Sequence, residues 1–152
     1  MQLIRIDLPQ AQLLWEMQLE AFSEFPEKYK DYDIDPACEK IDRIRHRLTD
    51  GSFYYFITVN SEKVGAVRVI DHGDSSAKRI SPIFILKQYR SKGFAAQAIK
   101  LAEQLHGEHN WALETILQEK GSCRLYEKLG YKRTGRVDKI NEYMDLVYYE
   151  KD

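Results

Sequence analysis

The chain has 152 residues, 43% of them hydrophobic and 12% aromatic, with a formal net charge of −1 at pH 7. This length favours a single domain with a core of useful size, and the composition excludes a disordered chain. The balance of 23 Lys plus Arg against 24 Asp plus Glu argues against a nucleic-acid-binding protein that depends on a broad basic field.

Cysteine usage and hydropathy indicate the compartment. Cys38 and Cys123 are too few for a disulfide framework, which favours a reduced, intracellular protein. The first residues lack a basic segment followed by an apolar one, and no stretch approaches the roughly 20 apolar residues of a membrane span. We therefore expect a soluble, cytoplasmic protein with one domain over residues 1–152 and neither nucleic acid nor membrane as a partner.

The first third of the chain predicts one strand and two helices. Apolar and polar residues alternate over residues 2–7, which is typical of a strand. Apolar spacing predicts a helix over residues 10–22 that is ended by Pro26, and residues 27–35, rich in Tyr and acids, are expected to form a loop. A second helix follows, with Asp35 as its expected N-cap.

The rest of the chain predicts six strands and two helices. The strands are expected over residues 53–59, 63–70, 79–86, 111–117, 131–137 and 143–149. The helices are expected over residues 92–106, with Leu105 among the inward residues, and 121–129. The order β-α-α-β-β-β-α-β-α-β-β predicts an α/β (α+β) fold with a central mixed, mostly antiparallel sheet of about seven strands and four helices. The strands on either side of helix 92–106 should be parallel neighbours.

The turn between the strand at 79–86 and the following helix has the composition of a phosphate site. Arg90 and Lys92 supply positive charge, while Gly93 and Ala95 are small enough for a pyrophosphate to approach the main chain. The first amides of the helix have no intrahelical partner and carry partial positive charge. The alternative is an ordinary turn with solvated basic residues, and the pattern R-x-x-G-x-A does not decide between the two.

Two segments together resemble the GNAT N-acetyltransferase superfamily, whose members transfer acetyl groups from acetyl-CoA to amines. Residues 83–95, IFILKQYRSKGFA, are similar to the acyl-CoA motif Q/R-x-x-G-x-G/A of the family. Residues 125–131, LYEKLGY, are similar to the family motif LYEKLGF. The two motifs occur in the family's order with a predicted strand between them, and the order of elements resembles the family over nearly the whole chain.

The resemblance implies that acetyl-CoA is the acyl donor and that no metal is needed. Main-chain groups of Ile83, Phe84 and Ile85 would pair with the pantetheine arm, and an N–H near Phe84 or Ile85 would stabilise the oxyanion. The residues that would hold the pyrophosphate follow that strand: Arg90, Ser91, Lys92, Gly93, Phe94, Ala95 and Ala96.

The resemblance also implies catalytic residues. Tyr126 matches the tyrosine that protonates the departing CoA thiolate, although it could instead be a core aromatic. Glu114 matches a strand position where some members that acetylate protein amines carry a catalytic glutamate; its alternative is a solvent-facing or salt-bridged residue. Glu119 stands where the family often has an asparagine and is a second candidate for the base, acting directly or through water.

The implied function is an acyltransferase that moves an acetyl group from acetyl-CoA to a primary amine by direct attack in a ternary complex. The acceptor would be a small-molecule or peptide amine. An acidic and aromatic group in the first helix and the loop after it either forms a lip for a cationic amine or is solvated: Glu20, Glu24, Tyr29, Tyr32 and Asp33. The alternative function is a non-catalytic acyl-CoA-sensing or partner-binding module, and the final strand is expected to be able to pair with a second copy in a homodimer.

Overall fold

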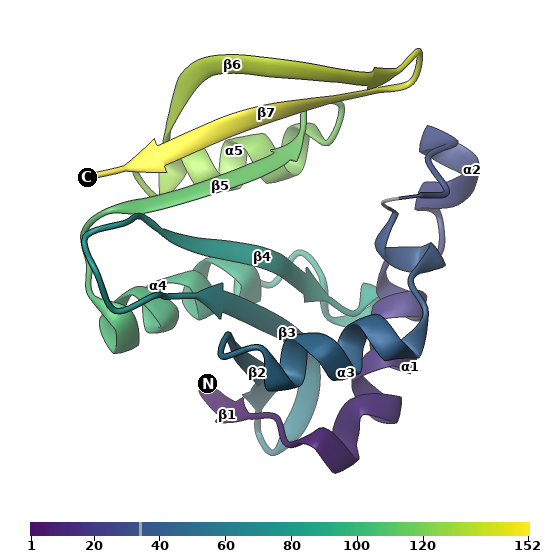
Figure 1. The fold of residues 1–152 in the computed structure, drawn as a ribbon, viewed down its shortest axis with the longest axis vertical. Coiled ribbons are helices and arrows are strands. Elements are labelled where there is room, and N and C mark those ends of the chain that lie inside the picture. Colours follow the sequence, from purple (N-terminus) through teal and green to yellow (C-terminus); the bar gives the residue numbers. More distant parts are fainter. Residues whose placement is uncertain (34) are drawn as a thin grey trace.

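The protein is described from a computed structural model that covers residues 1–33 and 35–152. Its strands are β1 (Gln2–Arg5), β2 (Phe53–Val59), β3 (Glu62–Ile70), β4 (Lys78–Ile85), β5 (Trp111–Ile116), β6 (Lys132–Asn141) and β7 (Met144–Lys151). Its α-helices are α1 (Ala11–Ala21), α2 (Phe25–Tyr29), α3 (Ile41–Thr49), α4 (Phe94–His106) and α5 (Lys120–Lys128). The strands form one mixed sheet in the order β1-β2-β3-β4-β5-β7-β6 (Figure 1). The predicted α/β fold with a seven-stranded mixed sheet is confirmed.

The prediction for the segment after α1 was wrong in two respects. Pro26 does not end the first helix but lies in the first turn of the additional helix α2, where its missing N–H leaves no intrahelical bond unmade. Asp35 is a cap, since its carboxylate accepts the N–H of Ala37 at 2.8 Å, but it caps a 3-10 turn over Pro36–Cys38. The α-helix begins only at Ile41.

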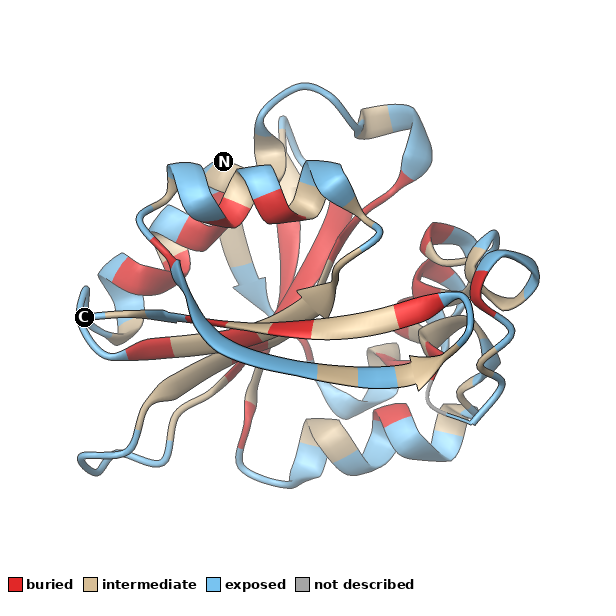
Figure 2. Cartoon of the chain, turned by 90° about the horizontal axis from the view of Figure 1, so that it is seen from above, coloured by how far each residue is buried: buried red, intermediate tan, exposed pale blue. Residues whose placement is uncertain are grey.

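Side-chain alternation in the sheet builds one core on each face. In β2, Tyr54 and Phe56 pack with residues of α1 and α3, whereas Tyr55 and Ile57 pack with residues of α4 and α5. Consecutive strand residues point to opposite faces, so a strand buried on both sides reads as a continuous apolar run. Figure 2 shows this burial running along the middle of the sheet.

One expected core position of α4 is exposed. The side chain of Leu105 points to solvent, with 61% of its surface accessible, while Glu103 is buried. The Glu103 carboxylate is compensated because it accepts hydrogen bonds from the Tyr131 hydroxyl at 2.9 Å and from Lys151 Nζ at 3.1 Å. A buried charge is tolerated where it is paired and hydrogen-bonded. The buried face of α4 therefore ends at Ala102 and Glu103 and does not include Leu105.

The sheet opens between its two parallel neighbours. β4 and β5 pair only at Lys78 with Trp111 and at Arg79 with Ala112. Beyond these two pairs β4 continues along β3, with a register shift opposite residues 67–69, and β5 continues along β7. The two strands therefore diverge toward the end of β4 (Figure 1), and main-chain groups on that edge of β4 are left without a strand partner.

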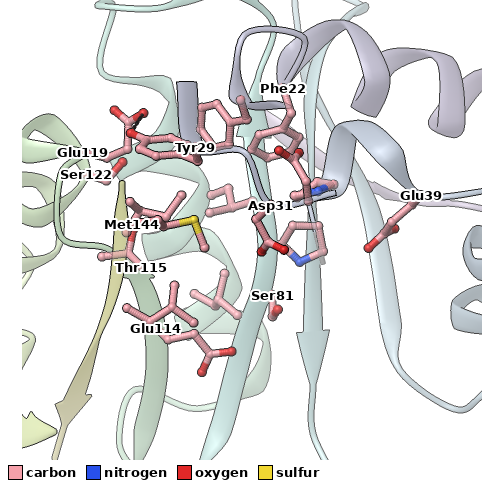
Figure 3. Close-up of a pocket in the computed structure, with 18 of the residues that line it drawn as sticks. Phe22, Tyr29, Asp31, Glu39, Ser81, Glu114, Thr115, Glu119, Ser122 and Met144 are labelled. Carbon is pink, nitrogen blue, oxygen red and sulfur yellow. Dashed lines mark hydrogen bonds between the residues drawn. The ribbon is translucent and has the colours of Figure 1, made fainter. Parts of the chain in front are cut away.

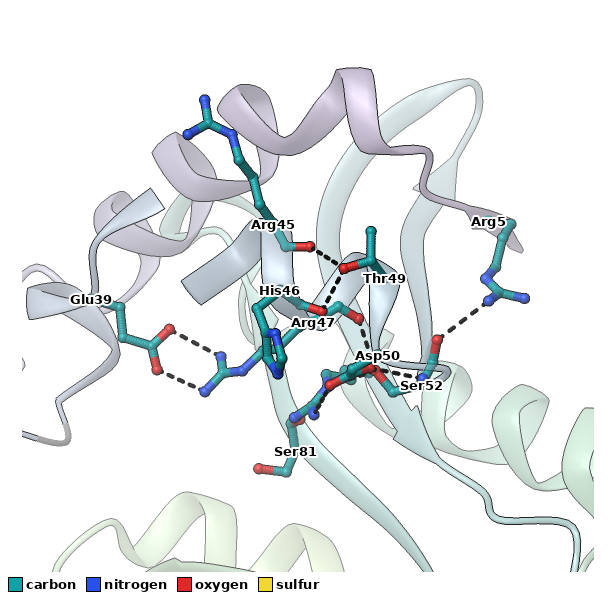
Figure 4. Close-up of polar contacts among 10 residues, drawn as sticks. Arg5, Glu39, Arg45, His46, Arg47, Thr49, Asp50, Ser52 and Ser81 are labelled. Carbon is teal, nitrogen blue, oxygen red and sulfur yellow. Dashed lines mark hydrogen bonds and ion pairs between the residues drawn. The ribbon is translucent and has the colours of Figure 1, made fainter. Parts of the chain in front are cut away.

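A polar network at the end of α3 braces β4 where it diverges (Figure 4). The guanidinium group of Arg68 in β3 donates to the main-chain oxygen of Ser81 at 2.9 Å and to Ser52 Oγ at 3.0 Å. Asp50 completes the network, since its carboxylate accepts from Ser52 Oγ at 2.7 Å and pairs with Arg68 at 3.4 Å. The irregular part of β4 is thus fixed from the side opposite β5.

The final strand is not at the edge of the sheet. β7 lies between β5 and β6 and pairs with both, so its main-chain ladders are already filled. The expected dimer contact through this strand is therefore wrong, because the hairpin over residues 132–151 inserts its second strand into the sheet. The edge strands are β1 and β6.

Within the described ranges, no helix has the length and apolarity needed to cross a bilayer.

Candidate active site

Two adjoining cavities lie in the opening between β4 and β5. The α4 cavity, of about 550 Å³, follows the end of β4 to the N-terminus of α4. The β5 cavity, of about 450 Å³, lies between β4, β5 and residues 29–39 (Figure 3). Six residues border both: Phe22, Phe25, Ile83, Glu119, Ser122 and Tyr126. These six define the junction of the two cavities.

The turn before α4 presents main-chain amides to the α4 cavity. Ser91 and Gly93 have left-handed φ values of 63° and 79°, which turn the chain into the helix. The first hydrogen bond of α4 runs from Gln97 N–H to Gly93 O at 3.2 Å, so the amides of residues 94–96 have no partner within the helix. Such amides, together with the positive end of the helix dipole, suit an anionic group.

The two basic side chains of this turn differ in what they contact. Arg90 donates through Nε to the Ile85 carbonyl at 2.9 Å and through an Nη atom to the Ala21 carbonyl at 2.5 Å. It therefore ties the end of β4 to the end of α1 while bordering the α4 cavity. Lys92 is exposed and is not among the residues that border this cavity. The groups of this turn that would suit an anion at the α4 cavity are thus its amides and Arg90.

The register of β4 decides which main-chain groups face the opening. A Cβ at Gly65 of β3 would collide with the Phe84 carbonyl oxygen, so that carbonyl points to β3. The N–H of Leu86 also donates to β3, at 2.8 Å. Because successive residues alternate, the main-chain groups of Ile83 and Ile85 face the opening. The register thus gives no support to the expected main-chain contact of Phe84, whose side chain borders the α4 cavity.

Tyr126 of α5 lies at the junction of the cavities. Its side chain is 7% exposed, and no hydrogen-bond partner for its hydroxyl is found among the residues that the structure describes. The ring packs against those of Tyr131 and Tyr149, with centroids 6.1 Å away in each case. Burial raises the pKa of Tyr126 to about 12, so the hydroxyl keeps its proton at neutral pH and can donate it to an anion formed beside it.

Glu119, the residue before α5, also lies at the junction. One oxygen of its carboxylate accepts from the Tyr29 hydroxyl at 2.6 Å and from Lys28 Nζ at 3.0 Å. Burial, followed by the bond to Glu119, raises the pKa of Tyr29 to about 12, so this hydroxyl stays a donor. Glu119 is thereby held between the two cavities by the helix α2.

Glu114 of β5 has a different environment. It borders the β5 cavity alone. Its carboxylate forms a close ion pair with the guanidinium group of Arg79, which belongs to β4. This is the salt-bridged arrangement that the sequence left open as its alternative role.

The acidic and aromatic group expected at the acceptor side is only partly at the cavities. Tyr29 and Asp33 border the β5 cavity, and Glu24 borders the α4 cavity. Neither Glu20 nor Tyr32 borders either one. The structure adds three carboxylates to the β5 cavity that were not expected at the acceptor side: Asp31, Asp35 and Glu39. The aspartates at positions 31, 33 and 35 follow a regular spacing in the sequence, and this pattern could have predicted an acidic cluster.

Comparison with known proteins identifies the family. Residues 18–152 match the model of the Acetyltransferase (GNAT) domain, so the chain belongs to the GNAT acetyltransferase family. No curated protein sequence matches the chain significantly.

Several solved acetyltransferases share the fold. A chimera of the spermidine N-acetyltransferase SpeG from Vibrio cholerae and hSSAT has a TM-score of 0.74 at 14% identity, covering 99% of this chain and 95% of that one. The microcin C7 self-immunity acetyltransferase MccE, in complex with acetyl-CoA and AMP, has a TM-score of 0.74 at 19% identity, covering 98% and 90%. The aminoglycoside 6′-acetyltransferase type Ii has a TM-score of 0.71 at 17% identity, covering 99% and 96%. At these identities the likeness shows a common fold.

Proposed function

We propose that the protein is an N-acetyltransferase that moves an acetyl group from acetyl-CoA to a primary amine by direct attack in a ternary complex. The observation that carries this proposal is the position of Tyr126, a buried residue whose hydroxyl has no partner among the described residues, where the α4 cavity and the acidic β5 cavity meet. Membership of the GNAT family and the solved relatives bound to acetyl-CoA or CoA support acetyl-CoA as the donor.

The donor would occupy the α4 cavity. The free amides of residues 94–96 and the charge of Arg90 suit its pyrophosphate. The outward main-chain groups of Ile83 and the N–H of Ile85 suit the amides of the pantetheine arm, which would add to the open edge of β4 as a strand does. The Ile85 N–H is the candidate donor to the thioester carbonyl; an oxyanion donor is worth about 3 kcal/mol of transition-state stabilisation.

The acceptor amine would enter from the β5 cavity and attack at the junction. A protonated amine must first lose a proton, and Glu119 is the proposed recipient, through water, because it borders both cavities. As the C–N bond forms and the C–S bond breaks, Tyr126 would donate its proton to the departing thiolate. Direct attack needs no covalent intermediate on the enzyme.

Replacing Tyr126 by Phe tests the acid role. Removing a general acid should lower kcat by about 10²–10⁴-fold, whereas acetyl-CoA affinity should stay nearly constant because the hydroxyl is needed only when the thiolate leaves. Steady-state rates of thiol release and a binding titration with acetyl-CoA give the two quantities. Tyr143→Phe is the control, since Tyr143 is half exposed and borders neither cavity. Unchanged kcat in Tyr126→Phe would show that the acid assignment is wrong.

A non-catalytic acyl-CoA-binding module is the alternative function on the same fold. It would bind CoA in the α4 cavity but release no thiol in the presence of any amine. The position of the Tyr126 hydroxyl at the junction favours the enzyme, because a module that only binds acyl-CoA has no use for a proton donor beside the second, acidic cavity.

A further inference from the structure

We infer that the acceptor is a small aliphatic diamine or polyamine, and that the aspartates of residues 31–35 hold its second ammonium group while the first reacts. The inference rests on the proposed function and names the substrate class of that same site. It is carried by the charge, the lining and the size of the β5 cavity.

The β5 cavity has an excess of negative charge. Its lining contains six carboxylates: Asp31, Asp33, Asp35, Glu39, Glu114 and Glu119. Three of them form ion pairs, which are Glu39 with Arg47, Glu114 with Arg79, and Glu119 with Lys28. Arg43 is the one further cation in the described lining. Counting it with the three partners, four cations face six carboxylates, so two negative charges are left without compensation.

The uncompensated charge lies on the aspartates. No ion-pair partner for Asp31, Asp33 or Asp35 is found within residues 1–33 and 35–152. Asp35 is 5% exposed and accepts a single N–H, from Ala37. Burial, and then the neighbouring carboxylates of Asp31 and Glu39, raises the pKa of Asp35. A cation bound among these groups would relieve both the desolvation and the repulsion.

Asp31 gives a second, independent observation. Its Oδ2 atom is shielded from solvent and has no hydrogen-bond donor within the described parts of the chain. Figure 3 shows the Asp31 carboxylate directed into the middle of the pocket, on the side facing Glu114. A buried carboxylate oxygen without a donor is costly, because it has lost its water and gained nothing in exchange. An ammonium group in the cavity brings positive charge and three donors to this position.

The lining changes character from the junction to the aspartates. Phe22 and Phe25 border both cavities, and the ring of Tyr29 continues the aromatic wall, with successive centroids 5.1 and 5.2 Å apart. Asp31 and Asp33, in contrast, border only the β5 cavity. Aromatic faces pack against methylene groups and attract cations. An alkyl chain along this wall would therefore join an amine at Tyr126 to an ammonium at the aspartates.

The size of the cavity favours a small acceptor. A volume of about 450 Å³ lies in the range of small-molecule sites. Within the described residues, no three His, Cys, Asp or Glu side chains are arranged to hold a metal ion. A lysine-bearing peptide is the competing occupant, and the experiment includes it as a separate arm.

The test compares amines of matched length in thiol release from acetyl-CoA: butane-1,4-diamine, propane-1,3-diamine, butylamine and a peptide with one lysine. A charge-assisted bond to the second ammonium should give the diamines a kcat/KM at least about tenfold above that of butylamine. Asp31→Asn should raise the KM for butane-1,4-diamine by about tenfold and leave that for butylamine unchanged. Asp42→Asn, an exposed aspartate paired with Arg45 outside the cavities, is the matched control.

Three outcomes would overturn the inference. Equal use of diamine and butylamine would show that the second charge is not recognised. An equal loss for both amines in Asp31→Asn would show a structural role only, and preference for the peptide would show a different acceptor class. In each of these cases the proposed acetyl transfer stands. If CoA binds but no amine releases thiol above the rate of spontaneous hydrolysis, the proposed function itself fails.

Discussion

The two glutamates that the sequence offers as bases are distinguished by their partners. Glu114 is ion-paired with the guanidinium group of Arg79 and borders one cavity, whereas Glu119 borders both. The contact between Glu119 and Lys28 involves a half-exposed lysine, and such surface pairs are worth only about 0–1 kcal/mol. In the proposed mechanism, Glu119 would exchange this contact for a water that carries the proton of the amine.

Glutamine variants at both positions separate the two roles. Glu119→Gln keeps the shape and the acceptor oxygen but removes the base, so kcat should fall by about 10²-fold or more. Glu114→Gln should change kcat much less, because its charge serves the pair with Arg79. Rates measured from pH 6 to pH 9 with saturating acetyl-CoA provide the comparison. A larger loss of kcat in Glu114→Gln than in Glu119→Gln would reverse the assignment.

At the residue scale, the sequence pointed to the region of the candidate site more clearly than to the contacts that its individual residues make. Tyr126, Glu119 and the turn at Gly93 border the two cavities. The role of the Phe84 main chain was not predictable, because it depends on the register between β3 and β4. The contact of Arg90 with the Ala21 carbonyl joins residues 69 positions apart in the chain, which no local pattern reveals.

At the scale of elements, a buried histidine joins the end of α4 to the sheet. The ring nitrogens of His106 are hydrogen-bonded to the Asp71 carboxylate, just after β3, and to the Tyr55 hydroxyl in β2, each at 2.9 Å. The ring also packs edge-on against Phe53, with centroids 4.7 Å apart. This cluster lies away from both cavities and fixes α4, whose other end carries the free amides of residues 94–96.

Replacing Asp71 by Asn tests this cluster through the pH dependence of stability. Hydrogen bonds from the Gly73 N–H and from His106 hold the pKa of Asp71 below its usual value. A carboxyl with a lowered pKa in the folded state contributes stability that is present above the unfolded pKa of about 4 and is lost as the pH falls through the folded value. Asp71→Asn should therefore lower the free energy of unfolding by about 1 kcal/mol at pH 7.

The same variant should match the parent protein in acid, because both then lack the charge. Urea unfolding measured at pH 7 and then at steps down to about pH 2 follows the difference across the transition. Asp42→Asn, which removes an exposed carboxylate, serves as the control and should alter stability little at either pH. Equal stability of parent and Asp71→Asn at pH 7 would contradict the role of this cluster.

The elements themselves were predicted where periodicity is strong and missed where a short helix depends on tertiary contacts. The strands of the sheet and α4 follow clear apolar patterns. The helix α2 has five residues, too few to be stable alone, and is held by contacts of Lys28 and Tyr29 with Glu119. Since those partners lie some 90 residues away in the chain, the local sequence rich in Tyr and acids indicated only a loop.

At the scale of the whole molecule, the divergence of β4 and β5 is the feature that creates the site. A parallel pair with only two paired positions leaves one edge of β4 open, and the two cavities lie along that opening. The order of elements predicted the parallel pair, but not how soon it ends, nor that β7 enters the sheet beside β5. Both depend on the irregular register of β4 and on long-range pairing.

Acetyl transfer to an amine is the central claim, and a mass balance on the unmodified protein tests it most directly. The purified chain is incubated with acetyl-CoA and the amine panel, free thiol is titrated, and the amines are analysed by mass spectrometry. The account predicts one acetylated amine for each thiol released, with the diamines reacting fastest. Binding of CoA without any acetylated amine, or thiol release with no N-acetyl product, would contradict it.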